Sequence, residues 1–229
     1  MRPNPGFIIL ALFLAVVCVK PVSAQRIFMT GDSHVKSKIY PNMVEENLRE
    51  KFPELEFGWW GKNGICFHSF NTNREYFDTI ISFRPDILIV HLGTNGAYGN
   101  GFTRKKFRHE MEQFYTTIKT ELPELRLVFV TPFTNKMRVR GKKKGRWVVN
   151  PHNREAAQEI LAFAEEHPDT WVIDNNGKEG LGFLKTRGLI RRDNVHLTET
   201  GYRALGNDVA EDILASESLC ETLNSFIPL

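Results

Sequence analysis

Short apolar runs alternate with segments of helical periodicity along most of this chain, and this alternation limits the folds that it can form. Because the run from Ile87 to His91 is almost continuously apolar, it is typical of a strand covered on both faces. Runs of strand length occur at residues 27–30, 55–60, 87–91, 125–130 and 171–174, and helical patterns at 39–51, 76–83, 107–118, 151–166 and 198–215.

Strands separated by helices form a parallel sheet, because right-handed crossovers place the helices on its two faces. We therefore expect an α/β protein: a three-layer α/β/α sandwich with a five-stranded parallel sheet. The commonest sheet of this size has the flavodoxin-like order 2-1-3-4-5 and binds ligands at the carboxyl ends of strands 1 and 3. No repeat or low-complexity linker interrupts the pattern, so residues 25–229 are expected to form one domain.

The loop predicted to follow the first strand has the sequence Gly31-Asp32-Ser33-His34. Gly-Asp is strong turn chemistry, so Ser33 is expected at the end of the strand, exposed on a rigid support. A serine hydroxyl is a poor nucleophile at neutral pH unless a base removes its proton and hydrogen-bond donors stabilise the charge that forms on the substrate oxygen. The alternative is that Asp32 and Ser33 only cap the next helix.

His196 is the best candidate for that base among the seven histidines. Asp193 precedes it by three residues, so the carboxylate can fold back onto Nδ1 and leave Nε2 free for the Ser33 hydroxyl. An Asp-x-x-His pattern is common, and a solvated turn capped by Asp193 is the alternative. His34 and His91 are expected to have structural roles.

Donors for an oxyanion are predicted on the loops that follow the first, second and third strands. The backbone N–H groups of Ser33 and Gly64 and the side-chain amide of Asn95 are expected to surround one oxygen. Glycine at position 64 would let the backbone approach this oxygen without a Cβ in the way. Each loop also fits an ordinary turn, with Asn95 in a left-handed conformation. Their order along the chain nevertheless favours a shared site.

Four sequence blocks resemble those of the SGNH (GDSL-like) hydrolase family: Gly31-Asp32-Ser33, Gly64, Gly93-Thr94-Asn95 and Asp193-Asn194-Val195-His196. The resemblance covers essentially the whole chain after residue 24. It implies that Ser33 is the nucleophile, His196 the general base and acid, and Asp193 its orienting partner. It also assigns the oxyanion hole to the N–H groups of Ser33 and Gly64 and to the Asn95 amide.

His34 stands where the family's name has leucine. The Gly-Asp-Ser-His form looks most like exported members that remove O-acetyl groups from bacterial cell-wall or other polysaccharides. We therefore expect a serine esterase without a cofactor that acts on an acylated small molecule or polysaccharide. The alternatives are a lipase or thioesterase, an O-acetyltransferase with the same triad, and a non-catalytic glycan-binding protein on the same fold.

Aromatic residues in or beside these loops are the candidates for substrate contact. Trp60, Phe67 and Tyr98 could stack on sugar rings, although they also fit loop packing. The basic stretch from Arg138 to Arg146 could attract an anionic polymer, with a solvated loop as the alternative. Little in the loops indicates a long apolar channel, which favours a small acyl group.

Composition narrows the partners further. The net charge of +3 is small and diffuse, and no nucleic-acid-binding signature accompanies it, so nucleic acid is not an expected partner. No Cys or His pattern has metal-ligand spacing, so no metal site is expected. Cys66 and Cys220 could pair in an exported protein, but two separate thiols fit equally well. The sequence does not set the oligomeric state.

Residues 1–24 have the pattern of a signal peptide. Arg2 precedes an apolar run from Phe7 to Val19, and Val22-Ser23-Ala24 matches a cleavage site. Because the run is short for a membrane span, we expect cleavage, export to the periplasm or the extracellular space, and no stable membrane insertion. The alternatives are an uncleaved anchor and lipidation at Cys18, which the bulky Val17 disfavours.

Overall fold

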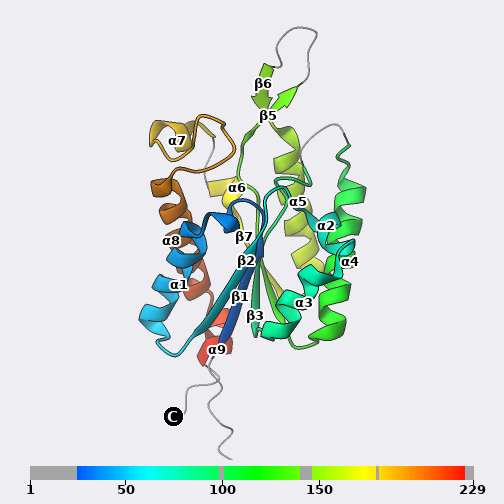
Figure 1. The fold of residues 1–229 in the computed structure, drawn as a ribbon, viewed down its shortest axis with the longest axis vertical. Helices are drawn as coiled ribbons and strands as arrows, with labels where there is room; N and C mark the ends of the chain where they lie inside the picture. The colour runs from blue at the N-terminus through cyan, green and yellow to red at the C-terminus, as the bar shows by residue number, and fades with distance from the viewer. Residues whose placement is uncertain (1–24, 98–100, 140–145, 179–180, 225–229) are drawn as a thin grey trace, which may run out of the picture.

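A parallel sheet with helices on both faces forms the centre of the molecule (Figure 1). The computed structural model describes residues 25–97, 101–139, 146–178 and 181–224, so the predicted signal peptide lies outside the described residues. The strand order is β2-β1-β3-β4-β7, which confirms the predicted order 2-1-3-4-5. The strands of this sheet are β1 (Arg26–Gly31), β2 (Glu56–Gly61), β3 (Ile87–His91), β4 (Arg126–Val130) and β7 (Thr170–Ile173).

The helices predicted from apolar periodicity are present, and several shorter ones were not predicted. The predicted group is α1 (Ile39–Lys51), α3 (Arg74–Phe83), α4 (Arg104–Glu121), α5 (Pro151–Glu166) and α8 (Glu199–Ala215). The additional ones are η1 (Val35–Ser37), α2 (Phe67–Asn71), α6 (Asn175–Lys178), α7 (Leu181–Thr186) and α9 (Glu217–Asn224). Most of these are a turn or two long, and so short a segment carries little periodicity for a sequence pattern to reveal.

Two hydrophobic cores lie on opposite faces of the sheet. Successive strand residues point to opposite faces, so Ile27 and Met29 of β1 enter one core and Phe28 enters the other. Helices α1, α8 and α9 cover the first face, and α2, α3, α4 and α5 cover the second (Figure 1). Burial on both faces explains why Ile87–His91 is apolar almost throughout.

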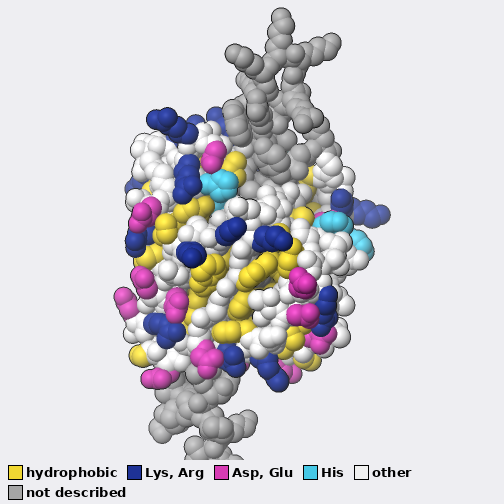
Figure 2. Space-filling model, in the orientation of Figure 1, with side chains coloured by type: hydrophobic (Ala, Val, Ile, Leu, Met, Phe, Trp, Pro, Cys, Tyr) yellow, Lys and Arg dark blue, Asp and Glu magenta, His cyan; other side chains and the backbone are white. Residues whose placement is uncertain are grey.

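Strand β2 lies at one edge of the sheet and is less buried than β1 or β3. Its residues from Phe57 to Gly61 are half-buried. Figure 2 shows hydrophobic side chains in the middle of the face that carries this strand, with acidic and basic side chains scattered around them. The aromatic side chains of β2 therefore belong partly to a sheet edge and partly to the cores.

The basic stretch expected as a loop is partly a β-hairpin, which corrects the prediction. Strands β5 (Lys136–Val139) and β6 (Arg146–Val149) pair in antiparallel register and project beyond the carboxyl ends of the sheet (Figure 1). Val139 pairs with Arg146, and residues 140–145 lie outside the described residues. Because Lys136, Arg138 and Arg146 lie in these strands, the stretch resembled a charged loop more than two strands.

The strand register brings three loops to one level at the carboxyl edge of the sheet. Gly31 of β1 is the partner of Gly61 in β2 and of His91 in β3. A Cβ atom at Gly31 would lie 2.5 Å from Val35 Cγ2 and 2.6 Å from the His91 carbonyl oxygen, so only glycine fits there. The chain can thus turn tightly out of β1 and present Ser33 beside the other two loops.

Candidate functional site

Ser33, His196 and Asp193 form one hydrogen-bonded chain at the carboxyl edge of the sheet. His196 Nε2 lies 3.0 Å from Ser33 Oγ, and His196 Nδ1 lies 2.9 Å from Asp193 Oδ2. Both contacts have hydrogen-bond length and use different ring nitrogens, so the imidazole can accept a proton from the serine while donating to the carboxylate. The structure therefore brings together the three side chains that the sequence singled out, 163 positions apart in the case of Ser33 and His196.

Asp193 also organises the loop that carries His196. Its Oδ1 accepts hydrogen bonds from the backbone N–H groups of Val195 and His196, both at 2.9 Å, and Asn194 between them has a left-handed backbone with φ 59°. Burial tends to raise the pKa of Asp193, but these N–H groups and the His196 ring together lower it below its ordinary value. Asp193 is thus both a local turn-former and the partner of His196, so both interpretations of its sequence pattern apply.

Asp32, which precedes the candidate nucleophile, is fully buried. Its Oδ1 accepts the His34 N–H at 3.0 Å and its Oδ2 accepts the Asn95 side-chain amide at 3.1 Å. Burial raises the pKa of Asp32 to about 7, and the His34 N–H only partly offsets this. Neither Asp32 nor Ser33 caps the following helices: the residues at their amino ends are His34 and Lys38, neither of which makes a side-chain cap. The cap alternative is therefore wrong.

Buried polar rings pack beneath the Ser33 loop. His34 stacks on His91 with ring centroids 5.5 Å apart, and its Nδ1 lies 3.3 Å from the Tyr202 hydroxyl. Tyr40 meets the His91 ring edge-on at 5.5 Å. Burial lowers the pKa of His91 to about 3, and burial with repulsion from His91 and His196 holds the pKa of His34 well below its usual range. Both rings are therefore neutral at pH 7 and fit the structural roles expected for them.

Asn95 joins the loops that follow β1, β2 and β3. Its Nδ2 donates to Asp32 Oδ2 and to the Ile65 carbonyl oxygen, each at 3.1 Å. Ile65 directly follows Gly64, so one amide ties together the residues next to two of the predicted oxyanion donors. An amide has two N–H groups, and both are engaged here. Asn95 can donate to a substrate oxygen by sharing one of them in a three-centre hydrogen bond.

Gly64 is required for a different reason from the one that the sequence suggested. Its backbone has φ +77°, a conformation that residues other than glycine rarely adopt. A Cβ built on Gly64 meets nothing within 4 Å, so no protein atom crowds this position. The need for glycine comes from the backbone angle of the turn, and the residue faces open, exposed space beside the site.

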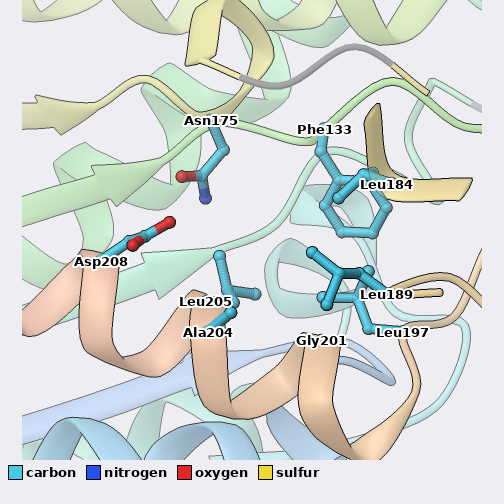
Figure 3. A pocket seen from close by; sticks show the side chains of 9 residues that line it. All are labelled: Phe133, Asn175, Leu184, Leu189, Leu197, Gly201, Ala204, Leu205 and Asp208. Carbon is cyan, nitrogen blue, oxygen red and sulfur yellow. The ribbon is translucent and has the colours of Figure 1, made fainter. Parts of the chain in front are cut away.

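Two pockets lie near these loops. The first, with a cavity volume of about 210 Å³, is lined in part by Asn95, Gly96 and the polar side chains of His68, Lys106 and Glu110. The second has a cavity volume of about 40 Å³ and is mostly apolar (Figure 3). Its lining comprises Phe133, Asn175, Leu184, Leu189, Leu197, Gly201, Ala204, Leu205 and Asp208. Because Leu197 directly follows His196, the apolar pocket adjoins the loop of the candidate base.

A family model described as GDSL-like lipase/acylhydrolase matches residues 30–204, a span that contains all four sequence blocks. The chain belongs to this family. It is accordingly an enzyme, an esterase of the SGNH type. No curated protein matches the chain. Within the described ranges, no group of three or more His, Cys, Asp or Glu side chains is arranged to hold a metal ion.

Solved structures of GDSL-like and other esterases share the fold. A peptidoglycan O-acetylesterase has 11% sequence identity and a TM-score of 0.74, with 88% of this chain and 93% of that chain covered. An acetyl xylan esterase has 18% identity and a TM-score of 0.65, with 82% and 99% covered. A lipase/acylhydrolase from Enterococcus faecalis has 16% identity and a TM-score of 0.60, with 82% and 95% covered. At these identities the likeness shows the fold alone.

The aromatic residues predicted to contact substrate lie in different surroundings. Phe67 is 1% exposed and packs against Phe107, Phe114 and Phe129, so the prediction that it contacts substrate is wrong. Its ring is part of the hydrophobic core beneath α2. Trp60 is half-buried, and its ring lies 4.8 Å from that of Tyr76, so most of its surface is used in packing. Tyr98 lies outside the described residues.

Sequence reasoning missed the role of one polar residue in the site and of another in the adjoining pocket. It treated Asp32 as a turn residue and did not connect it to Asn95, because an aspartate in a turn gives no sign of a partner 63 residues away. It also did not single out Glu110, which resembles any other acid on a surface helix.

Cys66 and Cys220 are both free thiols in the structure, Cys66 partly exposed and Cys220 buried. Of the two alternatives that the sequence left open, a disulfide and two separate thiols, the structure has the separate thiols.

Proposed function

We propose that this GDSL-like hydrolase is a serine esterase that removes O-acetyl groups from a carbohydrate or cell-wall glycan. The observation that carries the proposal is the His196 imidazole held between the Ser33 hydroxyl at 3.0 Å and the Asp193 carboxylate at 2.9 Å. A base in contact with a hydroxyl and oriented by a carboxylate is the arrangement that activates serine.

In the first half of the proposed reaction, Ser33 Oγ attacks the ester carbonyl carbon while His196 Nε2 takes the hydroxyl proton. The negative charge that develops on the carbonyl oxygen is stabilised by the N–H groups of Ser33 and Gly64 and by the Asn95 amide. When the C–O bond breaks, His196 gives its proton to the departing sugar oxygen. The acetyl group then remains on Ser33 as an ester.

In the second half, water attacks the acetyl-Ser33 carbonyl and His196 removes a proton from it. The tetrahedral species collapses, Ser33 Oγ leaves and regains its proton from His196, and acetic acid departs. Asp193 stays ionised throughout and stabilises the imidazolium, in keeping with the lowered pKa of its carboxyl group. No step requires a cofactor.

Two observations support an acetylated carbohydrate as the substrate. Two of the structural neighbours act, by their descriptions, on acetylated glycans, namely peptidoglycan and xylan. The pocket that contains Asn95 is lined by polar and charged side chains, which do not suit a fatty acyl chain.

A lipase or thioesterase activity is the second candidate, and the apolar pocket beside the His196 loop favours it. Its leucine and phenylalanine side chains offer an apolar surface to a longer acyl chain (Figure 3). Because the cavity volume is only about 40 Å³, these side chains would have to move apart to admit one. An O-acetyltransferase with the same triad would differ only in the second half-reaction, where a sugar hydroxyl would replace water. Acetylated product formed from a glycan acceptor would identify it.

Hydrolysis of p-nitrophenyl esters from acetate to octanoate tests these candidates. Ser33→Ala should lower turnover by about 10⁴-fold or more, because the nucleophile is lost. Ser82→Ala, at an exposed position on α3, is the matched control and should keep the wild-type rate. Acetate cleaved best by the wild type supports a deacetylase. A rate that rises with chain length supports the lipase or thioesterase, and equal rates in wild type and Ser33→Ala overturn the serine mechanism.

We also propose that the protein is exported, on the strength of the signal-peptide pattern of residues 1–24. Among the described residues, no helix has the length and apolar character needed to cross a membrane. Mass spectrometry of the protein recovered from the extracytoplasmic fraction should give an amino terminus at or near Gln25. Recovery of the intact chain in the membrane fraction would instead support an uncleaved anchor.

A further inference from the structure

A polar pocket adjoins the proposed oxyanion hole through Asn95. It lies between the start of α2, the loop after β3 and the first half of α4, and Asn95 and Gly96 form part of its wall. Asn95 is also hydrogen-bonded to Asp32, next to Ser33, so the pocket and the residues proposed to bind the ester share the Asn95 side chain. Its cavity volume of about 210 Å³ is large enough for a sugar ring.

Glu110 has the least exposed side chain among the acidic and basic residues that line this pocket. The side chain is 10% exposed, and its carboxylate contacts two basic side chains that are more than 60% exposed. His68 Nδ1 lies 3.5 Å and Lys106 Nζ 3.8 Å from Glu110 Oε1. Neither carboxylate oxygen is among the fully buried polar atoms without a partner, so the carboxylate opens onto the pocket. Because a carboxylate offers about four acceptor positions, Glu110 has capacity for donors supplied by a ligand.

The rest of the lining suits a ring that has hydroxyl groups and an apolar face. Lys106 and His68 add polar groups beside the carboxylate, and half-buried Phe102 adds an aromatic ring. Sugars have this combination: hydroxyl groups that donate to a carboxylate, and C–H faces that pack on aromatic rings. A fatty acyl chain would displace water from Glu110 and supply no donors in return, at a cost in binding free energy.

We infer that this pocket is the subsite for the sugar ring of the substrate and that Glu110 accepts hydrogen bonds from its free hydroxyl groups. The inference rests on the proposed function and extends it, since it makes Glu110 a specificity-determining residue for carbohydrate esters. It places the sugar on the Asn95 side of Ser33.

The test compares two acetate esters that differ in whether they carry a sugar. Partially acetylated xylo-oligosaccharides have free hydroxyl groups, whereas p-nitrophenyl acetate has none. Glu110→Gln should lower kcat/KM for the oligosaccharides at least tenfold more than for the aryl ester, mainly through a higher KM, because the substituted amide is a weaker acceptor. Lys106→Gln, at an exposed position, should lower the ratio of kcat/KM for the oligosaccharides to kcat/KM for the aryl ester severalfold. This variant provides the test if Glu110→Gln does not fold.

Glu112→Gln is the matched control. Glu112 lies on the same helix, is 49% exposed and pairs with Arg108 at 2.8 Å, away from the pocket lining. It should leave the ratio of the two kcat/KM values unchanged. An unchanged ratio in folded Glu110→Gln, or in Lys106→Gln where the first variant does not fold, overturns the subsite. So does a wild type that cleaves aryl acetate but no acetylated oligosaccharide. Failure of the proposed function itself has a different signature, namely aryl acetate hydrolysis that survives Ser33→Ala.

Discussion

Asp32 and Asp193 make the same local contact in opposite surroundings. Each accepts, through Oδ1, the backbone N–H two residues ahead: His34 for Asp32 at 3.0 Å and Val195 for Asp193 at 2.9 Å. Asp32 is fully buried, whereas the Asp193 side chain is 43% exposed. Burial raises the pKa of Asp32 to about 7, while hydrogen bonds and the His196 ring outweigh burial at Asp193 and lower its pKa.

The comparison shows that a turn motif does not determine the charge of its aspartate. Asp193 has the electrostatic properties of a carboxylate that must stay ionised beside an imidazolium. Asp32 has the electrostatic properties of a group that titrates near neutral pH. It also connects two loops through its hydrogen bond with Asn95. The exposed aspartate should therefore matter most to turnover, and the buried one should matter most to the pH dependence of stability.

The largest expected effect comes from Asp193→Asn. The amide can still accept the loop N–H groups, but the His196 ring is then expected in the tautomer that has its proton on Nε2, facing Ser33, where it cannot act as a base. We expect kcat to fall about 10⁴-fold with little change in melting temperature. Ester hydrolysis and thermal unfolding measure the two effects, with exposed Asp78→Asn as the control. A loss below tenfold would show that His196 does not depend on this carboxylate.

The next effect should come from Asp32→Asn and concerns stability. Between about pH 4 and pH 7 the folded wild type holds a proton on Asp32 that the unfolded chain has released, so this group makes the free energy of unfolding decrease as pH rises. Over that window the contribution amounts to about 4 kcal/mol at roughly 1.4 kcal/mol per pH unit. Urea unfolding at several pH values should show that the wild type loses this amount relative to the variant.

Parallel pH profiles of the two proteins would contradict a raised pKa at Asp32. The exposed Asp78→Asn variant is again the control and should follow the wild-type profile, because an exposed ion pair contributes little to stability.

Asn95→Ala should reduce kcat by about 10²- to 10³-fold, through loss of an oxyanion donor. It also removes the hydrogen bonds to Asp32 and to the Ile65 carbonyl, so a loss of stability should accompany it. Steady-state kinetics and urea unfolding separate these effects. A kcat loss below tenfold together with reduced stability would mean that Asn95 connects the loops without stabilising the transition state.

The smallest effect should come from Gly64→Ala, on the turn that Asn95 ties to Asp32. Alanine at φ +77° is strained, with an expected cost of about 1 kcal/mol in the free energy of unfolding, and no clash adds to it. Gly64→Asn should cost less, since asparagine tolerates this conformation better. Chemical denaturation of both variants measures the difference. A loss of several kcal/mol in Gly64→Ala would indicate crowding that the structure does not have.

The fold could be predicted from the sequence because its determinants are local and repeated. The apolar runs are buried on both faces of the sheet. Each end of a predicted strand lies within one residue of the observed end. The hairpin of β5 and β6 was not predicted, because its basic residues obscured the strand pattern. Helices α2, α6 and α7 are too short for their periodicity to be recognised.

The candidate triad could be predicted for a related reason: Asp193 and His196 are neighbours in sequence, and the topology puts Ser33 at the same sheet edge. The substrate contacts were less successful. Phe67 and Trp60 were chosen because they are aromatic, and aromatic residues beside a crevice also fill cores. Which of them faces a ligand depends on the direction of a short helix or strand end, and no local pattern specifies that direction.

The sequence by itself determined the order of the strands, the sheet edge at which the loops meet and the pairing of His196 with Asp193, since each depends on residue spacing and general rules of chain connection. Tertiary structure alone decided the charge of Asp32, its bond to Asn95, the burial of Phe67 and the exposure of Glu110 to a pocket. The physical reason is that desolvation depends on the atoms brought together from distant parts of the chain. A carboxylate in a turn or on a helix has the same sequence signature whether it ends in water or in the core.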